Sequence, residues 1–524
     1  MNPGRGRGWF PYDRCVTGGA TEARRRDAGR PHVLIVVQNL PVPLDRRVWL
    51  ECQALVAAGY RVSVVCPAGP GDPAYAEIDG VRIWKYRPPP DAEGLLGYLY
   101  EFAYCWLRTA RLARRVWRSE PFDALQACNP PDTYWALARR YRRHGVRFVY
   151  DQHDLNPEVF RSRFGEPGGL AGRAQYRALL WLEHRTYRSA DHVIATNASY
   201  RQVALSRGRC RPGDVTVVRS GPDTSTMRPV LGRPELRRGR RQLGVYLGIM
   251  GPQDGVDIVL RALDVLVHRM GRDDLHVALL GFGDCYDQLV DLAHALDLDD
   301  YVTFTGRADR RVVTEYLSTA DIGLSPDPQS PLNDVSTMNK TMEYMSYALP
   351  VVAFDLAETR VSAGDAAVYV ESTGDSVDDV ERYAKAVEEL LDDPERRATM
   401  ALAARRRAVA ELDWVPQRRR YVGVFDRLLG APPQPPEAPG WPEVDRRRRH
   451  VDPAALRDEW GNSMVDLRDP SGLDRFVRDR GIPPAGVPDT SGQAPEPPAP
   501  TELAPTELGS AAGPDADDRD PDAG

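Results

Sequence analysis

The stretch His32-Val33-Leu34-Ile35-Val36-Val37 decides the fold together with Arg61-Val62-Ser63-Val64-Val65-Cys66. Both are short apolar runs rich in β-branched residues, which is typical of strands buried on both faces of a parallel sheet. Between them, residues 45–58 have a helical pattern that ends at Gly59. A strand, a helix and a strand in so short a span predict a βαβ unit, which closes right-handed into a parallel sheet.

The same alternation of strand and helix continues along the chain. Further strands are predicted at 81–86, 123–128, 147–150, 192–195 and 215–218, and then at 244–250, 275–280, 301–304, 321–324, 349–353 and 367–370. Two such α/β series of similar size predict two doubly wound, Rossmann-like domains that face each other across a cleft. The expected divisions are a disordered arm (1–30), a first domain (31–225), a second domain (226–430) and a largely disordered tail rich in Pro and Asp (431–524). Weak helical pattern persists in the tail at 453–480.

Composition narrows the functional classes. The 524 residues include 69 basic and 75 acidic side chains, and this net charge of −6 argues against a chain-wide nucleic-acid-binding protein. The seven cysteines are scattered without a Cys-x-x-Cys pair, so neither a disulfide framework nor a metal site is predicted. No signal-peptide core and no run of about 20 apolar residues is visible, so we expect a cytoplasmic protein, with or without peripheral attachment to a membrane.

One predicted helix differs from the others in its side chains. Residues 95–107 (LLGYLYEFAYCWL) are aromatic and apolar, and the segment continues to residue 118 with five arginines. Such a helix is suited to the surface of an anionic membrane, for example the inner face of the plasma membrane. The alternative is a helix packed on its own sheet with a solvated basic end.

Candidate functional residues gather in the polar loop, helix and short strand of residues 333–352. Ser336 or Thr337 is predicted to cap the helix, and Ser336, Lys340 and Glu343 share one face at i, i+4 and i+7. A helix N-terminus beside an ammonium group suits an anionic ligand, and a carboxylate accepts hydrogen bonds from hydroxyl groups. The alternative is an ordinary amphipathic helix with an exposed Lys340–Glu343 pair. Three methionines at core spacing line a different face: Met338, Met342 and Met345.

Two other patterns lie directly after predicted strands. Asp151-Gln152-His153-Asp154 places a histidine where it can bind a ligand or assist proton transfer, although such a histidine is also common as a structural residue. The glycine-rich loop at 248–257 and the pair Gly281 and Gly283 can bring backbone amides close to a phosphate, or can serve plain turns.

In order and spacing, these motifs resemble those of the family 4 retaining glycosyltransferases of the GT-B fold, over residues 32–430. The resemblance is carried by residues 150–158 (YDQHDLNPE), 250–257 (MGPQDGVD) and 339–345 (NKTMEYM). It implies transfer of a sugar from a nucleotide diphosphate to an acceptor with retention at the anomeric carbon, without a metal or another cofactor. It also implies that the helix near residues 415–429 crosses back onto the first domain.

The resemblance also implies roles for particular residues. Glu343 matches the glutamate that binds the nucleotide ribose, Lys340 is placed to face the diphosphate, and His153 matches a histidine that lines the cleft near the transferred sugar. These three are the implied catalytic residues. The implied donor-binding set adds Gly251, Pro252, Gln253, Gly281, Gly283, Ser336, Thr337, Met338 and Asn339. The implied acceptor or phosphate side comprises Asp45, Arg46, Arg47 and Asp154.

The sequence departs from the family pattern in three places. Val335 stands where the family's Glu-x7-Glu motif has its first glutamate, and Asn333, Asp334 or Ser336 is the candidate replacement. Asp254 stands where a phosphate-binding lysine is usual, and the first loop lacks its usual glycine pair.

The expected activity is that of a hexosyl- or N-acetylhexosaminyl-transferase. Its expected partners are a nucleotide-sugar donor, a lipid-linked or glycan acceptor in cell-surface polysaccharide or glycoconjugate synthesis, and an anionic membrane contacted through residues 95–118. No nucleic-acid partner is expected. A nucleotide-sugar epimerase on the same fold and a non-catalytic GT-B scaffold are the alternatives.

Overall fold

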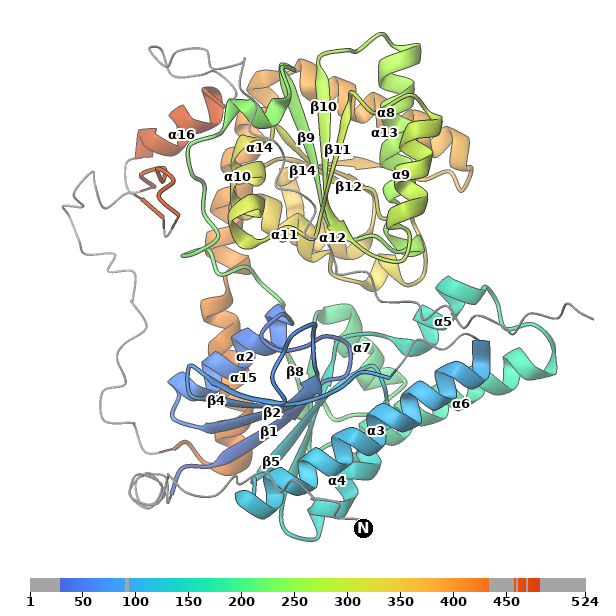
Figure 1. Cartoon of the computed structure of the whole chain (residues 1–524), viewed down its shortest axis with the longest axis vertical. Helices are drawn as coiled ribbons and strands as arrows, with labels where there is room; N and C mark the ends of the chain where they lie inside the picture. Colours follow the sequence, from blue (N-terminus) through green and yellow to red (C-terminus); the bar gives the residue numbers. More distant parts are fainter. Residues whose placement is uncertain (1–28, 90–93, 433–456, 459, 468–469, 481–524) are drawn as a thin grey trace, which may run out of the picture.

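The computed structural model describes residues 29–89, 94–432, 457–458, 460–467 and 470–480. They form two α/β units, one above the other in Figure 1, each built around its own sheet. Residues 1–28 of the predicted arm and residues 481–524 of the predicted tail lie outside the described part.

The first sheet has eight strands in the order β3-β4-β2-β1-β5-β6-β7-β8, and all its pairings are parallel except that of β3 with β4. Its strands are β1 (His32–Val36), β2 (Arg61–Pro67), β3 (Tyr75–Ile78), β4 (Val81–Tyr86), β5 (Ala124–Cys128), β6 (Arg147–Gln152), β7 (His192–Ala195) and β8 (Val215–Val217). Only β3 was not predicted, because this short edge strand is half exposed and has no apolar run.

Helices cover both faces of this sheet, which explains why the four residues after His32 in β1 are all apolar. Val33 and Ile35 pack toward α2 (Arg46–Ala57), whereas Leu34 and Val36 pack toward α3 (Gly94–Ser119) and α4 (Trp135–Arg142). The remaining helices of this unit are α5 (Asn156–Phe164), α6 (Gly169–Ser189) and α7 (Ala198–Ser206).

The second sheet has six strands, all parallel, in the order β11-β10-β9-β12-β13-β14. Its strands are β9 (Gln242–Ile249), β10 (Leu275–Phe282), β11 (Val302–Gly306), β12 (Ile322–Ser325), β13 (Val351–Phe354) and β14 (Ala367–Val370). Its helices are α8 (Val256–Asp264), α9 (Tyr286–Ala295), α10 (Arg310–Thr319), α11 (Asn339–Ser346), α12 (Ala357–Ala363), α13 (Ser376–Asp392) and α14 (Pro394–Arg407). The predicted fold of two doubly wound Rossmann-like domains is therefore confirmed.

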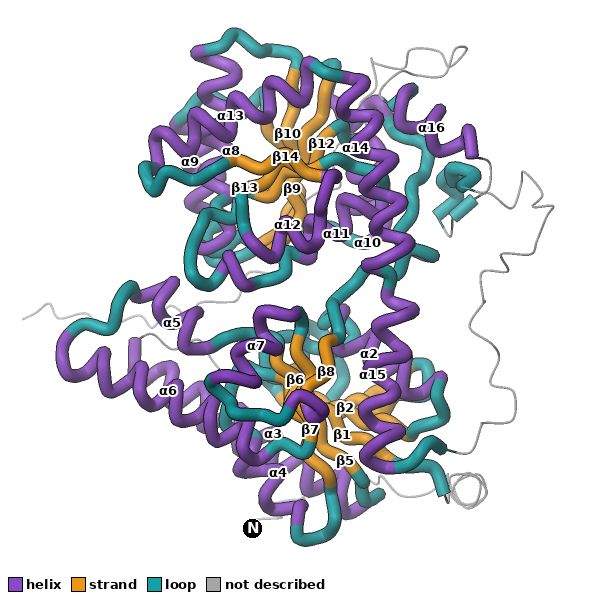
Figure 2. The backbone as a smooth tube through the Cα atoms, turned by 180° about the vertical axis from the view of Figure 1, so that it is seen from behind, coloured by secondary structure: helices purple, strands orange, loops and turns teal. Residues whose placement is uncertain are grey.

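The last long helix, α15 (Trp414–Leu429), returns to the first unit, as expected (Figures 1 and 2). Tyr421, Val424 and Phe425 are fully buried in the first unit's core beside α2. Up to the end of α15 the chain therefore crosses between the two units twice.

Part of the predicted tail is structured and packs on the second unit. Helix α16 (Pro470–Arg478) lies beside α14, in agreement with the weak helical pattern at 453–480. Arg480 donates hydrogen bonds to the carbonyls of Ala348 (2.9 Å) and Tyr347 (2.7 Å). These described segments lie where the weak helical pattern was noted, and because most of residues 431–524 lies outside the described part, the prediction of a largely disordered tail stays a prediction.

Among the helices of the described residues, none is both long enough and apolar enough to cross a membrane.

Candidate functional site

The carboxyl-terminal edges of the two sheets meet at the interface between the units. Asn197, just after β7, donates to the carbonyl of Val335 (2.8 Å) and to Oγ1 of Thr337 (3.0 Å). The hydroxyl groups of Tyr200 and Ser336 lie 3.0 Å apart. The loop that was predicted to bind the donor is thus bonded directly to the first unit.

A second contact joins the start of α2 to the middle of α11. Arg46, the first residue of α2, forms an ion pair with Glu343 of α11, and its other terminal nitrogen donates to the carbonyl of Gly221 (3.2 Å). The Arg46 side chain is 38% exposed and that of Glu343 is 18% exposed, so both remain accessible to solvent.

The start of α11 differs from the prediction. The helix begins at Asn339, and its N-cap, Met338, provides no side-chain hydrogen bond. Ser336 has extended backbone angles and lies outside the helix, so the expected cap by Ser336 or Thr337 is wrong. Tertiary contacts decided this, because both hydroxyl groups bond to the first unit instead.

Lys340 is buried in an ion-pair cluster. Its ammonium group lies 2.5 Å from Asp327 and 3.7 Å from Asp254, above the ring of Tyr246. Burial disfavours the charged form, but the two carboxylates outweigh burial and hold the pKa of Lys340 above its ordinary value. An exposed Lys340–Glu343 pair, the alternative interpretation of this helix, is wrong because the two side chains have different partners.

The candidates for the missing glutamate already have hydrogen-bond partners in the structure. Asn333 is buried and donates to the carbonyls of Gln253 (3.0 Å) and Pro328 (2.9 Å), so it ties two loops together. Asp334 accepts from the amide of Ala357, the first residue of α12 (2.9 Å). Which of Asn333, Asp334 and Ser336 acts as the substitute stays a prediction.

The two glycine-rich loops differ in what surrounds them. At Gly281 an added Cβ would lie 1.8 Å from the carbonyl oxygen of Gly248, so close strand packing alone demands glycine there. Gly283 is similarly close to the backbone of Met250. In the 251–254 turn, by contrast, Oε1 of Gln253 is buried without a hydrogen-bond partner among the described residues, which leaves an acceptor to be satisfied.

The predicted histidine belongs to a network with Arg47 and Asp151. His153 Nε2 lies 2.8 Å from Asp151 Oδ2 and 3.2 Å from Arg47 Nε. One ring nitrogen cannot donate to Asp151 and accept from Arg47 at once, and the shorter contact to a carboxylate favours donation to Asp151. Asp151 lies within β6, which extends to Gln152, and its side chain is fully buried.

The network extends through the interior to α15. Glu51 lies 3.1 Å from Arg47, and Gln126 donates to both Glu51 (2.8 Å) and Asp151 (2.9 Å). Tyr421 of α15 donates to Gln126 (2.6 Å). Burial and the Asp151 charge raise the pKa of Glu51 well above its ordinary value. Burial also opposes ionisation of Asp151, but Arg47 and His153 outweigh it and lower the pKa of that carboxyl.

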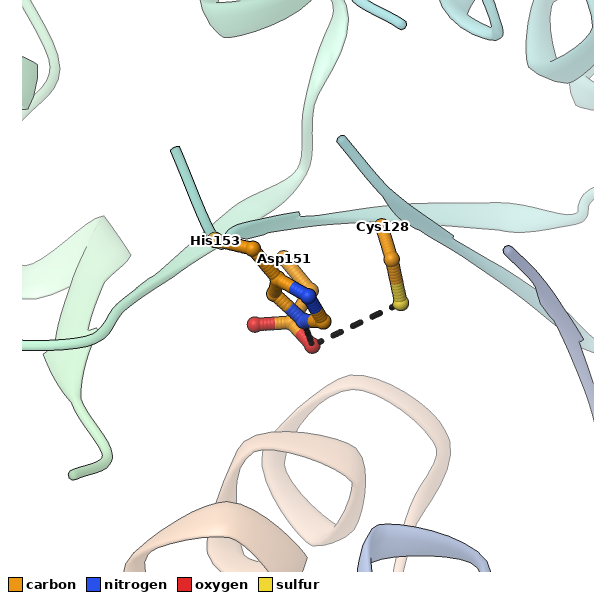
Figure 3. A group of neighbouring side chains, drawn as sticks. All are labelled: Cys128, Asp151 and His153. Atoms are coloured by element: carbon orange, nitrogen blue, oxygen red, sulfur yellow. Dashed lines mark hydrogen bonds and ion pairs between the residues drawn. The ribbon is translucent and has the colours of Figure 1, made fainter. Parts of the chain in front are cut away.

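Cys128 joins Asp151 and His153 in a group whose ligand-type atoms lie within 4.8 Å of one another (Figure 3). A metal ion there would compete with Arg47, which donates to Asp151 at 2.9 Å and is itself almost fully buried. The fixed positive charge makes this donor set a poor fit for a cation, and burial raises the pKa of the Cys128 thiol. We therefore interpret the group as part of the hydrogen-bond network.

The remaining predicted residues are near this network. Asp45 caps α2 by accepting from Val48 N (3.1 Å). The backbone amides of His153 (2.7 Å) and Asp154 (3.2 Å) both donate to Oδ1 of Asn129.

Several site residues were missed by the sequence prediction. Asn129 and Asn197 each follow a strand closely, and Glu51 is one helical turn after Arg47, so position alone could have suggested them. Asp327 likewise follows β12 by two residues, whereas Tyr421 carries no comparable local signal.

Family models match both units. Residues 44–221 match the model described as "Glycosyl transferase 4-like domain", and residues 241–393 match "Glycosyl transferases group 1". Together the two matches cover more than half of the chain.

Curated relatives and solved structures agree with these matches. The chain is 30% identical to a D-inositol 3-phosphate glycosyltransferase of Kineococcus radiotolerans over 43% of its own length and 55% of the relative's. It is 25% identical to a glycogen synthase of Mycobacterium tuberculosis over 71% of its own length and 87% of the relative's.

Among solved structures, sucrose-phosphate synthase of Thermosynechococcus elongatus covers 77% of this chain and 100% of its own, with a TM-score of 0.61 and 18% identity. Anabaena HepE in complex with UDP and glucose covers 76% of this chain and 100% of its own, with a TM-score of 0.56 and 16% identity. The two matched models, the two parallel sheets and the returning α15 together show that the chain belongs to the glycosyltransferases of the GT-B fold.

Proposed function

We propose that this glycosyltransferase moves a hexosyl or N-acetylhexosaminyl group from a nucleotide-diphosphate sugar to an acceptor, with retention at the anomeric carbon and without a metal ion. The acceptor we propose is a lipid-linked glycan in cell-surface polysaccharide or glycoconjugate synthesis. Support comes from the matched families and from HepE, a structural neighbour solved with UDP and glucose.

One observation carries this proposal: residues of both units converge where the carboxyl ends of the two sheets meet. Glu343, the implied ribose ligand, lies beside Arg46, and the loop that precedes α11 lies against Asn197. Ligands of open α/β sheets bind at this edge. His153 follows β6 at the same edge of the first sheet.

The test begins with thermal shift on a panel of nucleotide sugars, because a bound donor raises the melting temperature by mass action. The stabilising donor is then incubated with and without a glycan or lipid-linked acceptor. A transferase converts the donor only when an acceptor is present, an epimerase converts it alone, and a scaffold converts nothing. Anomeric configuration of the product is read by NMR, and activity in excess EDTA tests whether a metal ion takes part.

For the membrane we propose attachment through α3 to an anionic surface. On this helix Leu107 is 62% exposed and Tyr100 51% exposed, while Arg108 stacks on Tyr104 at 4.8 Å. Exposed apolar side chains beside arginines suit an anionic bilayer. Leu107→Glu should reduce co-sedimentation with vesicles that contain phosphatidylglycerol. The matched substitution Val377→Glu, at a side chain 65% exposed on α13, should leave co-sedimentation unchanged. Equal binding by both variants would contradict attachment through α3.

A further inference from the structure

The diphosphate that leaves in such a transfer carries negative charge that the protein must neutralise when no metal does so. The donor-side lysine is poorly placed for this. The Lys340 ammonium is buried between Asp327 and Asp254, so two carboxylates already face its single positive charge. The cluster as a whole carries excess negative charge and would repel a phosphate.

The other unit brings a pair of arginines to the same interface. Arg47 is almost fully buried and held by Asp151, Glu51, the carbonyl of Val218 and the hydroxyl of Ser220. It therefore cannot turn toward a ligand without breaking a buried ion pair.

Arg46 differs from its neighbour in both exposure and partners. Its side chain is 38% exposed and holds Glu343 and one backbone carbonyl, that of Gly221. A guanidinium group has five N–H donors and binds phosphate oxygens in the same forked geometry that it uses for carboxylates.

We propose that Arg46 changes partners when the donor binds. It releases Glu343 and neutralises the diphosphate from the opposite unit. This inference rests on the proposed function and on the role of Glu343 as the ribose ligand. In the empty protein Glu343 accepts from Arg46; with donor bound, the ribose hydroxyls donate to the same carboxylate. The freed guanidinium then lies beside the phosphates and can keep its bond to Gly221.

The exchange makes a specific thermodynamic prediction. Replacing Arg46 removes a competitor for Glu343 and also removes the phosphate ligand. Binding of a nucleoside without phosphates should therefore stay constant or tighten, whereas binding of its diphosphate should weaken. If Lys340 were instead the main phosphate ligand, a change at Arg46 would alter the affinities for the nucleoside and for its diphosphate alike.

The experiment compares the dissociation constants of UDP, GDP and ADP with those of uridine, guanosine and adenosine by isothermal titration calorimetry on the full chain. For the pair that the wild type binds, Arg46→Gln should weaken the diphosphate about 10- to 100-fold, the range of a charge-assisted hydrogen bond, without weakening the nucleoside. Arg46→Lys should recover part of the loss because it keeps the charge. Thermal unfolding of each variant confirms that it folds.

A matched control separates phosphate binding from the loss of an inter-unit contact. Arg219 forms a second ion pair between the units, with Glu358 at 3.2 Å, and Arg219→Gln should leave nucleotide affinity unchanged. If Arg219→Gln weakens UDP, GDP or ADP as much as Arg46→Gln does, or if Arg46→Gln weakens nucleoside and diphosphate equally, the inference is overturned. If the wild type binds no nucleoside diphosphate, the proposed function is overturned as well. If the wild type and Arg46→Gln bind a nucleoside diphosphate equally tightly, only the inference is overturned.

Discussion

Replacing Asp151 by asparagine and Glu51 by glutamine should have very different costs, although both carboxyls are fully buried in the same network. Asp151 is held as the anion because Arg47 and His153 outweigh the burial that opposes ionisation, and its pKa is lowered. Burial and the neighbouring Asp151 raise the pKa of Glu51 well above its ordinary value, so the native state holds the proton of that carboxyl more tightly than the unfolded chain does.

The magnitudes follow from the contacts. Asp151 lies within hydrogen-bonding distance of Arg47 (2.9 Å), Gln126 (2.9 Å) and His153 (2.8 Å). An asparagine has one acceptor oxygen in place of two, so at least one buried donor loses its partner. Breaking a buried ion pair costs about 3–5 kcal/mol, and because Arg47 keeps Glu51 at 3.1 Å we expect about 3 kcal/mol for Asp151→Asn. Glu51→Gln keeps the shape of the side chain and an acceptor for Gln126, and it removes a carboxyl whose ionised form burial already disfavours, so it should cost about 1 kcal/mol or less.

The assay is urea unfolding at pH 7.5, followed by tryptophan fluorescence, with the wild-type slope used to convert midpoints into free energies. The two variants also differ in pH dependence. The pKa of an unfolded glutamate is about 4.3, and that of Glu51 in the native state is raised above it. At a pH between these two values, the unfolded chain has lost the Glu51 proton while the native chain keeps it. Wild-type stability should therefore fall as pH rises through this window, and Glu51→Gln should remove that slope. Equal costs for the two variants, or a slope that survives in Glu51→Gln, would refute the charge assignment.

Three further predictions concern the core. Burial lowers the pKa of His276 to about 4, whereas the pKa of an unfolded histidine is about 6.5. As pH drops between these two values, the unfolded chain gains a proton that the native chain does not, so the free energy of unfolding should fall by on the order of 3 kcal/mol by pH 4. His276→Gln should reduce this loss in a series of melting temperatures measured against pH. Tyr421→Phe removes the 2.6 Å bond to Gln126 and should cost about 1–2 kcal/mol in urea unfolding, which a cost near zero would contradict. Gly281→Ala puts a Cβ 1.8 Å from the Gly248 carbonyl and should cost about 3 kcal/mol, whereas Gly374→Ala, at an open turn, should cost less; circular dichroism melts compare the two.

Local pattern was sufficient for most of the fold. Apolar runs such as that of β1, and helices such as α2, which was expected over 45–58 and spans Arg46–Ala57, were predicted nearly to the residue. The failures had two different origins. The edge strand β3 has no apolar run, and the start of α11 was misplaced because Ser336 and Thr337 bond to another unit.

The sequence predicted where the candidate site residues lie along the chain, but tertiary packing determined which side chains they contact. Sequence spacing placed Lys340 and Glu343 on one helix and His153 after a strand, but it could not assign their partners. Arg46 and Glu343 are 297 residues apart, and Tyr421 reaches Gln126 across 295 residues. Hydrophobic periodicity is a property of neighbouring residues and is legible in the chain itself. Charge pairing depends on which surfaces the two units and the returning helix bring together, so only the folded molecule shows which cation is buried with carboxylates and which is left at the surface.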